Sequence, residues 1–345
     1  MEKMLIINRY NLTINLAKYV WIISSFILMY CFIGENKVCA EGISNYTVQL
    51  LLPNHQNKEV TSYFDMCLQP NESDKIGIEI NNQENHAQHF QIAFTNATTN
   101  DNGIVDYTKK NVELVGDASI DFLQTVDKEN YQLEVASNSK KVMWFNVHMP
   151  NKQVAGIILG GVQVSNVNHD TQKQVLNHEV QYTAAIKLSQ NNEPIVPKLK
   201  ALSAKVDTID DHQVVKMTIQ NLTPVLLRKA EIRSRFYKEG DKTPLIDERK
   251  KGLSIAPNSE FNLFSPIVEA VKPGDYRYDI VIKNALGEWH LSKKVTITHA
   301  KAQEINKDYP RTPQSNEKLL IAAITCLSII LLLLVIKMMK VVKDR

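Results

Sequence analysis

Cysteine is scarce in this chain, and its distribution excludes a disulfide framework for most of the sequence. Of 345 residues only four are cysteine, at positions 31, 39, 67 and 326. Three of them lie in or beside two apolar segments at the chain ends, so Cys67 alone falls in the long region between them. That region cannot form an intrachain disulfide, and its stability must come from an apolar core.

Motifs of the common enzyme classes are also missing. The sequence has no GxSxG, no HExxH, no CxxC and no phosphate-binding glycine loop. His86 and His89 lie three residues apart, but beside an expected strand, which favours a solvated loop over a metal site. Segment 101–106 lacks the spaced oxygen ligands of a calcium loop. We therefore expect no catalytic residues, no metal and no cofactor, and we do not expect an enzyme.

The central region has no excess of charge of either sign. The formal net charge is +3, but residues 1–40 carry +2 and residues 319–345 carry +3, which leaves −2 for residues 41–318. A near-neutral region has no electrostatic footprint for nucleic acid. We expect no nucleic-acid partner, and contacts of mixed polar and apolar character.

Long apolar runs are confined to the two ends, and the first resembles a secretory signal. Basic residues precede the apolar segment 19–33, which is too short to span a bilayer comfortably. Val38-Cys39-Ala40 then supplies small residues where cleavage would occur. The pattern predicts a signal peptide at 1–40, with an uncleaved N-terminal anchor as the alternative.

The second apolar run has the composition of a membrane anchor. Segment 319–336 contains only Thr325 and Ser328 as polar residues, spans ~27 Å as a helix, and precedes the basic residues 337–345. Basic flanks stay cytoplasmic. The pattern predicts a single-pass membrane protein with a transmembrane helix at 319–336, a cytoplasmic tail at 337–345, and residues 41–318 outside, facing the cell wall. Pro313 stands where a sortase signal requires glycine, so covalent wall attachment is not expected.

Between the ends, apolar residues alternate with polar ones, as in half-buried strands. Such alternation occurs at 76–80, 90–94, 142–149, 180–188, 214–219, 232–236, 276–282 and 293–297. Turn residues separate the runs, for example Asp101-Asn102-Gly103. We interpret Tyr63, Phe64 and Trp144 as core residues of these strands, with stacking against a ligand as the alternative.

These patterns predict an all-β protein with two tandem Ig-like antiparallel β-sandwich domains. The first is expected at 41–165 and the second at 179–303, with a polar linker at 166–178. A stalk is expected at 304–318, entered by a helical turn at 300–306.

One polar turn offers candidate contact residues. It supplies amides, hydroxyls, carboxylates and a tyrosine, which suit glycan hydroxyls and acetamides or a partner protein. The candidates are Asn96, Thr99, Asn100, Asp101, Asn102, Asp106 and Tyr107. A hairpin that bonds mainly to itself explains the same residues, and we favour that structural role for most of them. Gly160 and Gly161 are expected to permit a bulge or close backbone approach.

Several segments resemble the WxL-interacting proteins of Gram-positive bacteria. In the first half these are Leu51-Leu52-Pro53-Asn54-His55-Gln56, Ser62-Tyr63-Phe64-Asp65, the run from Asn96 to Tyr107, Met149-Pro150 and the run from Gly156 to Gly161. In the second half they are Gln181-Tyr182, Ile219-Gln220-Asn221, Ala256-Pro257-Asn258-Ser259, Pro273-Gly274-Asp275-Tyr276 and Trp289. Pro70-Asn71 departs from the family's usual Pro-Gly.

The resemblance implies a non-enzymatic cell-surface binding protein. Its first domain would bind peptidoglycan, its second domain would bind host extracellular-matrix components, and the whole protein would partner WxL-domain surface proteins. An extracytoplasmic chaperone or assembly factor for cell-wall proteins is the alternative.

Overall fold

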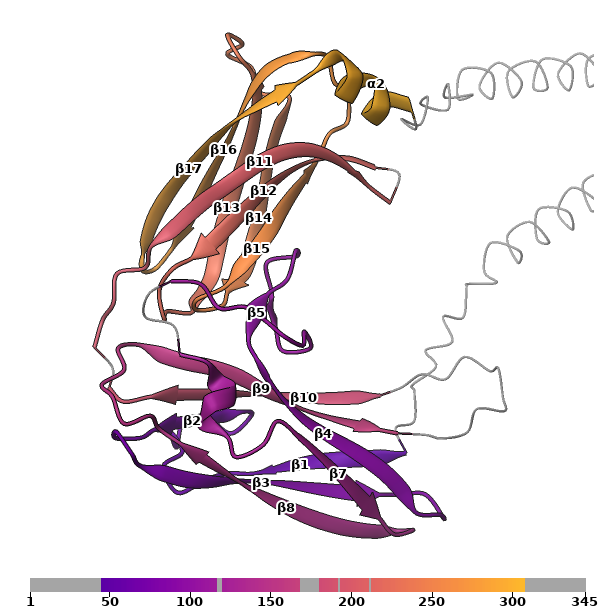
Figure 1. Ribbon diagram of the computed structural model, residues 1–345, viewed down its shortest axis with the longest axis vertical. Helices are drawn as coiled ribbons and strands as arrows, with labels where there is room; N and C mark the ends of the chain where they lie inside the picture. Colours follow the sequence, from indigo (N-terminus) through magenta and orange to yellow (C-terminus); the bar gives the residue numbers. More distant parts are fainter. Residues whose placement is uncertain (1–44, 117–119, 168–179, 192, 211, 308–345) are drawn as a thin grey trace, which may run out of the picture. The chain divides into compact units, whose positions relative to one another are not determined.

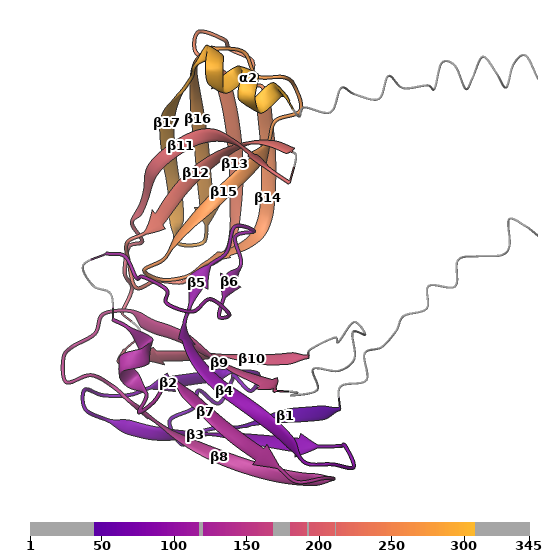
Figure 2. The same cartoon turned by 45° about the vertical axis from the view of Figure 1, so that its right-hand side comes forward.

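The chain folds into β-sheets almost throughout the part that the structure describes. The computed structural model describes residues 45–116, 120–167, 180–191, 193–210 and 212–307. Figures 1 and 2 show strands in the great majority there, with a single turn of 3₁₀-helix, η1 (Phe122–Thr125), and one short α-helix, α2 (His299–Lys307). The prediction of an all-β protein is confirmed, and the helical turn expected at 300–306 corresponds to α2.

The first half buries its core between two sheets. One sheet has the order β1-β3-β8, and the other has the order β2-β10-β9-β4-β7. The strands of the first sheet are β1 (Tyr46–Leu51), β3 (Ser73–Asn82) and β8 (Ser139–His148). The strands of the second are β2 (Phe64–Cys67), β10 (Gln181–Ser189), β9 (Ile157–Asn166), β4 (Gln88–Asn96) and β7 (Asn130–Val135).

Residue alternation explains which faces meet in this core. Ile76, Ile78 and Ile80 alternate along β3 and are fully buried in one apolar cluster with Phe90 and Ile92 of β4. Side chains two apart on a strand share one face, so each alternating run presents its apolar side chains to the opposite sheet.

Strand β9 is covered on both faces, and its two glycines are the reason that this is possible. A Cβ at Gly160 would lie 2.0 Å from Cδ1 of Phe122 in η1, and one at Gly161 would lie 2.6 Å from Cβ of Tyr107. The expected close approach at these glycines is therefore present, and aromatic side chains occupy the room.

The second half repeats the two-sheet arrangement. One sheet has the order β11-β12-β15, and the other has the order β14-β13-β16-β17. The first contains β11 (Leu199–Ile209), β12 (His212–Asn221) and β15 (Glu260–Pro266). The second contains β14 (Ile246–Ile255), β13 (Leu227–Lys238), β16 (Gly274–Asn284) and β17 (Gly287–Ile297). A second apolar cluster lies between them, and Ala302 and Ile305 of α2 join it.

One strand lies in a different sheet from the one expected. The sequence interpretation began the second sandwich at residue 179, whereas β10 pairs antiparallel with β9 and parallel with β2, within the first half. The alternating pattern identifies the buried face of a strand but carries no information about its neighbours. The segment that follows β10 therefore makes the crossing to the second half.

The expectation of a single-pass membrane protein requires correction. No helix among the described residues is long and apolar enough to cross a membrane, and α2 is a short helix with a polar composition. The expected transmembrane helix at 319–336 and tail at 337–345 lie outside the described residues. The expected signal peptide at 1–40, most of the expected linker at 166–178 and most of the expected stalk at 304–318 also lie outside them.

Candidate functional site

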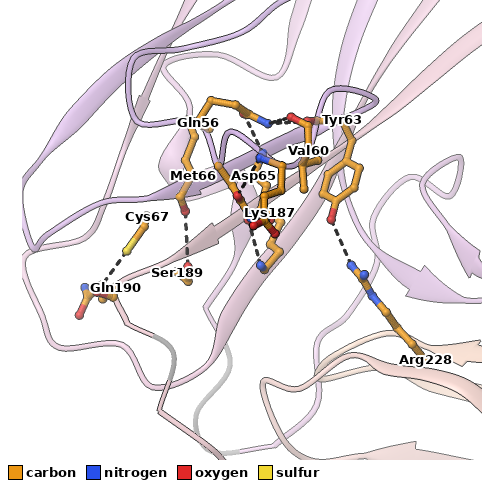
Figure 3. A network of polar contacts seen from close by, with 12 residues as sticks. Gln56, Val60, Tyr63, Asp65, Met66, Cys67, Lys187, Ser189, Gln190 and Arg228 are labelled. Carbon is orange, nitrogen blue, oxygen red and sulfur yellow. Dashed lines mark hydrogen bonds and ion pairs between the residues drawn. The ribbon is translucent and has the colours of Figure 1, made fainter.

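A single amide side chain fixes the loop that leads from β1 into β2. Nε2 of Gln56 donates to the carbonyl oxygens of Val60 and Tyr63, at 2.8 and 3.0 Å. Its Oε1 accepts from the backbone N–H of Asp65 at 3.0 Å. Figure 3 shows Gln56 above Asp65 and the ring of Tyr63 projecting towards Arg228. The loop is thus closed on itself, and Tyr63 is held in a defined position.

A buried ion pair lies beneath this loop. Asp65 on β2 is 5% exposed, and its Oδ1 lies 2.9 Å from Nζ of Lys187 on β10. Asn57 adds a hydrogen bond from Nδ2 to Oδ2 of Asp65 at 3.3 Å. Because a buried carboxylate needs compensating partners, the pair fixes β2 against β10.

Two tyrosines and an arginine gather at the edge of this network. The hydroxyl of Tyr63 accepts from Nη2 of Arg228, a residue of β13, at 3.3 Å (Figure 3). Tyr107 lies within electrostatic range of both. Burial raises the pKa of Tyr107 to about 12, while Arg228 opposes the rise and Tyr63 adds to it. The Tyr107 phenol is therefore neutral under physiological conditions.

Tyr63 and Arg228 border a cleft of about 440 Å³. Apolar walls and a few polar groups alternate around it, and both halves of the chain contribute. The lining residues are Asn57, Val60, Tyr63, Asp65, Gly156, Ile157, Lys187, Asn191, Glu193, Pro194, Ile195, Pro224, Val225, Leu226, Arg228 and Leu286. Such a volume with convergent polar groups is typical of a ligand or peptide site.

The lining of the cleft supplies groups that can bind a ligand. Asp65 and Glu193 balance Lys187 and Arg228, so the lining has no excess charge. Within the ranges that the structure covers, no group of three or more His, Cys, Asp or Glu residues could hold a metal ion. The cleft therefore offers hydrogen bonds, an aromatic hydroxyl and apolar contact area.

The first candidate from the sequence, Asn96, supports the local fold. Its Nδ2 donates to Oδ1 of Asp121 at 2.8 Å, and its Oδ1 accepts from the backbone N–H of Phe122 at 2.8 Å. Asn96 is buried and fixes the start of η1. Its hydrogen bonds serve the same Phe122 whose ring covers Gly160.

Two other candidates connect the halves of the chain. They belong to the hairpin formed by β5 (Thr98–Thr99) and β6 (Val105–Asp106). Oγ1 of Thr99 accepts from the backbone N–H of Ala256 at 2.9 Å. Oδ1 of Asp101 accepts from the backbone N–H of Asn262 at 3.3 Å. These contacts favour a structural role for both side chains.

The remaining candidates shape the hairpin itself or lie near the cleft. Oδ1 of Asn100 accepts from the backbone N–H groups of Asn102 and Ile104, at 3.0 and 3.1 Å. Oδ1 of Asp106 accepts from both the N–H and the hydroxyl of Thr108 at 2.7 Å. Tyr107 covers Gly161 of β9 and lies within electrostatic range of Tyr63 and Arg228.

The sequence contains no signal of the cleft, and two of the three aromatic residues expected in the core lie elsewhere. Phe64 is fully buried, as expected for the core, and Tyr63 is half-buried at the cleft. Trp144 was expected in the core, but it is 56% exposed. It alternates with buried Phe145 on β8 and so faces away from the opposite sheet. No local signal in the sequence pairs Tyr63 with Arg228.

Comparisons with solved structures give only distant likenesses. One is a chaperone–tip adhesin complex of CFA/I fimbriae biogenesis, with 11% identity, TM-score 0.30, and coverage of 71% of this chain and 96% of that chain. Another is the class 5 fimbriae chaperone CfaA, with 12% identity, TM-score 0.28, and coverage of 66% and 95%. A third is the Salmonella enterica SafA pilin in complex with the SafB chaperone, with 11% identity, TM-score 0.27, and coverage of 72% and 96%. At these scores the likenesses carry no argument about fold or function.

Family models match both halves, whereas no curated protein matches the chain. Residues 46–166 match the model described as WxL Interacting Protein, peptidoglycan binding domain. Residues 171–307 match the model described as WxL Interacting Protein, host binding domain. Both descriptions are of binding domains, and their order is the one that the resemblance implied. The chain therefore belongs to the family of WxL-interacting proteins.

Proposed function

We propose that this protein is a non-enzymatic surface binding protein that engages peptidoglycan through its first half and a WxL-domain protein through the cleft. The second half contributes binding of a host component. The family match supports the three kinds of partner. The observation that carries the choice of the cleft is the Tyr63–Arg228 contact, because it lies where the two matched segments meet.

The composition of the cleft suits a polypeptide partner. Tyrosine and arginine are enriched among the residues that dominate binding energy in protein interfaces. Exposed Pro194 and Leu286 supply apolar rims beside them. The balanced charges disfavour a polyanion, since a polyanion would need an excess of Lys and Arg.

The fold suits such a role, and we propose that both halves are Ig-like. In each half two sheets enclose one apolar cluster, and the strand order is not sequential. Scaffolds of this kind position loops for recognition while the core stays rigid.

The test is binding of a purified WxL-domain protein to the full chain, measured by biolayer interferometry. Arg228→Ala should weaken binding by at least about ten-fold, because it removes a cation of the cleft and its contact with Tyr63. Lys200→Ala removes an exposed cation of β11 as the matched control and should leave Kd unchanged. Equal binding by wild type and Arg228→Ala would contradict the assignment of the cleft. A complex that forms only transiently would point to a chaperone instead.

A further inference from the structure

The outer face of the sheet β1-β3-β8 carries an aromatic ring that lies beside a glycine of the neighbouring strand. Trp144 on β8 pairs with Gly77 on β3, and Gly77 pairs with Leu51 on β1. A Cβ at Gly77 would lie 2.8 Å from Cζ3 and 2.9 Å from Cε3 of Trp144. The indole therefore rests against the backbone of Gly77, in the space where any other residue would place a side chain.

This ring is unusually accessible for tryptophan. Its exposed fraction is 56%, although large apolar side chains are normally buried and each Å² of exposed apolar surface forgoes about 25 cal/mol. Val142, two residues earlier on the same strand and face, is 39% exposed. With one side supported by Gly77, the indole presents apolar surface to solvent on a rigid strand.

An ion pair and a hydrogen-bonded carboxylate flank the ring along the strands. Nζ of Lys140 lies 2.7 Å from Oε1 of Glu79, and Glu79 is the cross-strand partner of Val142. On the other side, Nδ2 of Asn146 donates to Oδ2 of Asp127 at 2.7 Å. The fringe thus offers hydrogen-bonding groups on both sides of the indole without the cationic excess that a polyanion requires.

The size and chemistry of this surface select the ligand. A stable protein interface buries about 800 Å² on each partner, far more than one indole and one valine supply. A pyranose ring fits better, because its C–H groups can lie on the negative face of an aromatic ring while its hydroxyls reach the polar fringe. Supported in advance, the indole loses little conformational freedom on binding.

We propose that Trp144, supported by Gly77, is the stacking platform for one sugar ring of the peptidoglycan glycan strand. This inference rests on the proposed peptidoglycan binding and names its contact. The platform lies within residues 46–166, the segment that matches the peptidoglycan binding domain.

The first test is pelleting of the full chain with insoluble peptidoglycan. Trp144→Ala should weaken binding by at least about ten-fold while leaving the melting temperature unchanged, because the ring is exposed and outside the core. Trp144→Phe should retain part of the affinity. The control is Leu202→Ala, which truncates an exposed apolar residue of a different strand, β11, and should bind like wild type.

The second test uses the fluorescence of the ring itself. The chain has three tryptophans, at 21, 144 and 289, and Trp289 is half-buried with Nε1 donating to the carbonyl of Pro197 at 2.9 Å. In a Trp289→Phe variant, soluble peptidoglycan fragments should shift the emission to shorter wavelength and reduce quenching by acrylamide. The same titration of Trp144→Phe/Trp289→Phe supplies the background.

The outcomes separate the inference from the function on which it rests. If wild type binds peptidoglycan and Trp144→Ala binds equally well, the platform is wrong and peptidoglycan binding stands. If wild type does not bind peptidoglycan, the proposed function fails, and the platform with it. A fluorescence response to the WxL-domain protein but not to peptidoglycan fragments would overturn the choice of a sugar ligand.

Discussion

The hydroxyl oxygens of Thr99 and Ser259 lie 2.8 Å apart, and this buried contact joins the two halves of the chain. Ser259 donates to the carbonyl of Ala256 at 2.9 Å, and Thr99 accepts from the N–H of the same residue at 2.9 Å. Each hydroxyl therefore has one donor and one acceptor role, with Thr99 donating to Ser259. A complete network of this kind fixes the position of the β5–β6 hairpin.

Removing the Thr99 hydroxyl should destabilise the protein. Thr99→Val leaves the N–H of Ala256 without its acceptor and the hydroxyl oxygen of Ser259 without its donor in a buried site, which costs about 1–3 kcal/mol. The measurement is the urea unfolding midpoint of the full chain. Thr99→Ser keeps the hydroxyl and should lose much less stability than Thr99→Val. Equal midpoints for wild type and Thr99→Val would show that the hydroxyl pair contributes nothing to stability.

Removing one partner of the ion pair between Asp65 and Lys187 should destabilise the protein more than removing both partners. Lys187→Met leaves Asp65 charged and buried without a countercharge, at a cost of about 1–3 kcal/mol after allowance for the half-buried lysine. The double variant Asp65→Asn/Lys187→Met removes that charge and should recover part of the loss. A double-mutant cycle of unfolding free energies measures the difference. Strict additivity of the two single losses would argue against direct coupling.

A histidine should make stability depend on pH near neutrality. Nδ1 of His55 lies 2.8 Å from Oδ2 of Asp74, and Nε2 lies 2.9 Å from Oε1 of Glu72. The hydrogen bond to Asp74, with the charge of Glu72, raises the pKa of His55 above 6.5, against a smaller opposing effect of desolvation.

Because the folded pKa is the higher one, the stabilisation by His55 is fully present below the unfolded value of 6.5. It is lost as pH rises through the raised pKa. The melting temperature of wild type relative to His55→Gln should therefore be highest on the acidic side of neutrality and should fall towards alkaline pH. NMR titration of the imidazole gives the pKa directly. A constant difference across that range would contradict the assignment.

The close contact at Gly160 should exclude any side chain. Gly160→Ala places Cβ 2.0 Å from Cδ1 of Phe122, so the ring or the strand must move. Overpacking of this kind costs about 1–3 kcal/mol. Thermal denaturation measures the loss. The double variant Gly160→Ala/Phe122→Leu removes the ring atoms that clash, so it should lose less stability than the sum of the losses of the two single variants. An additive loss of stability would contradict the contact.

Local chemistry made much of the fold predictable. The alternation of Ile76, Ile78 and Ile80 identifies a strand and its buried face, and both are as expected. The polar turn at Asp101-Asn102-Gly103 connects β5 to β6, and Gly103 adopts a φ of 70° that favours glycine. These features depend on a few neighbouring residues, so a single sequence contains them.

By itself, therefore, the sequence determined the all-β class, the faces of the strands, the position of the short helix and the family. Tertiary structure decided which strands are neighbours and which distant residues meet. Tyr63 and Arg228 lie 165 positions apart, and β10 joins the first half through pairing with β9 and β2. The exposure of Trp144 likewise depends on what covers the outer face of its sheet. The physical reason is that strand pairing and docking depend on the shapes of surfaces that form only on folding, and hydrophobic periodicity does not record them.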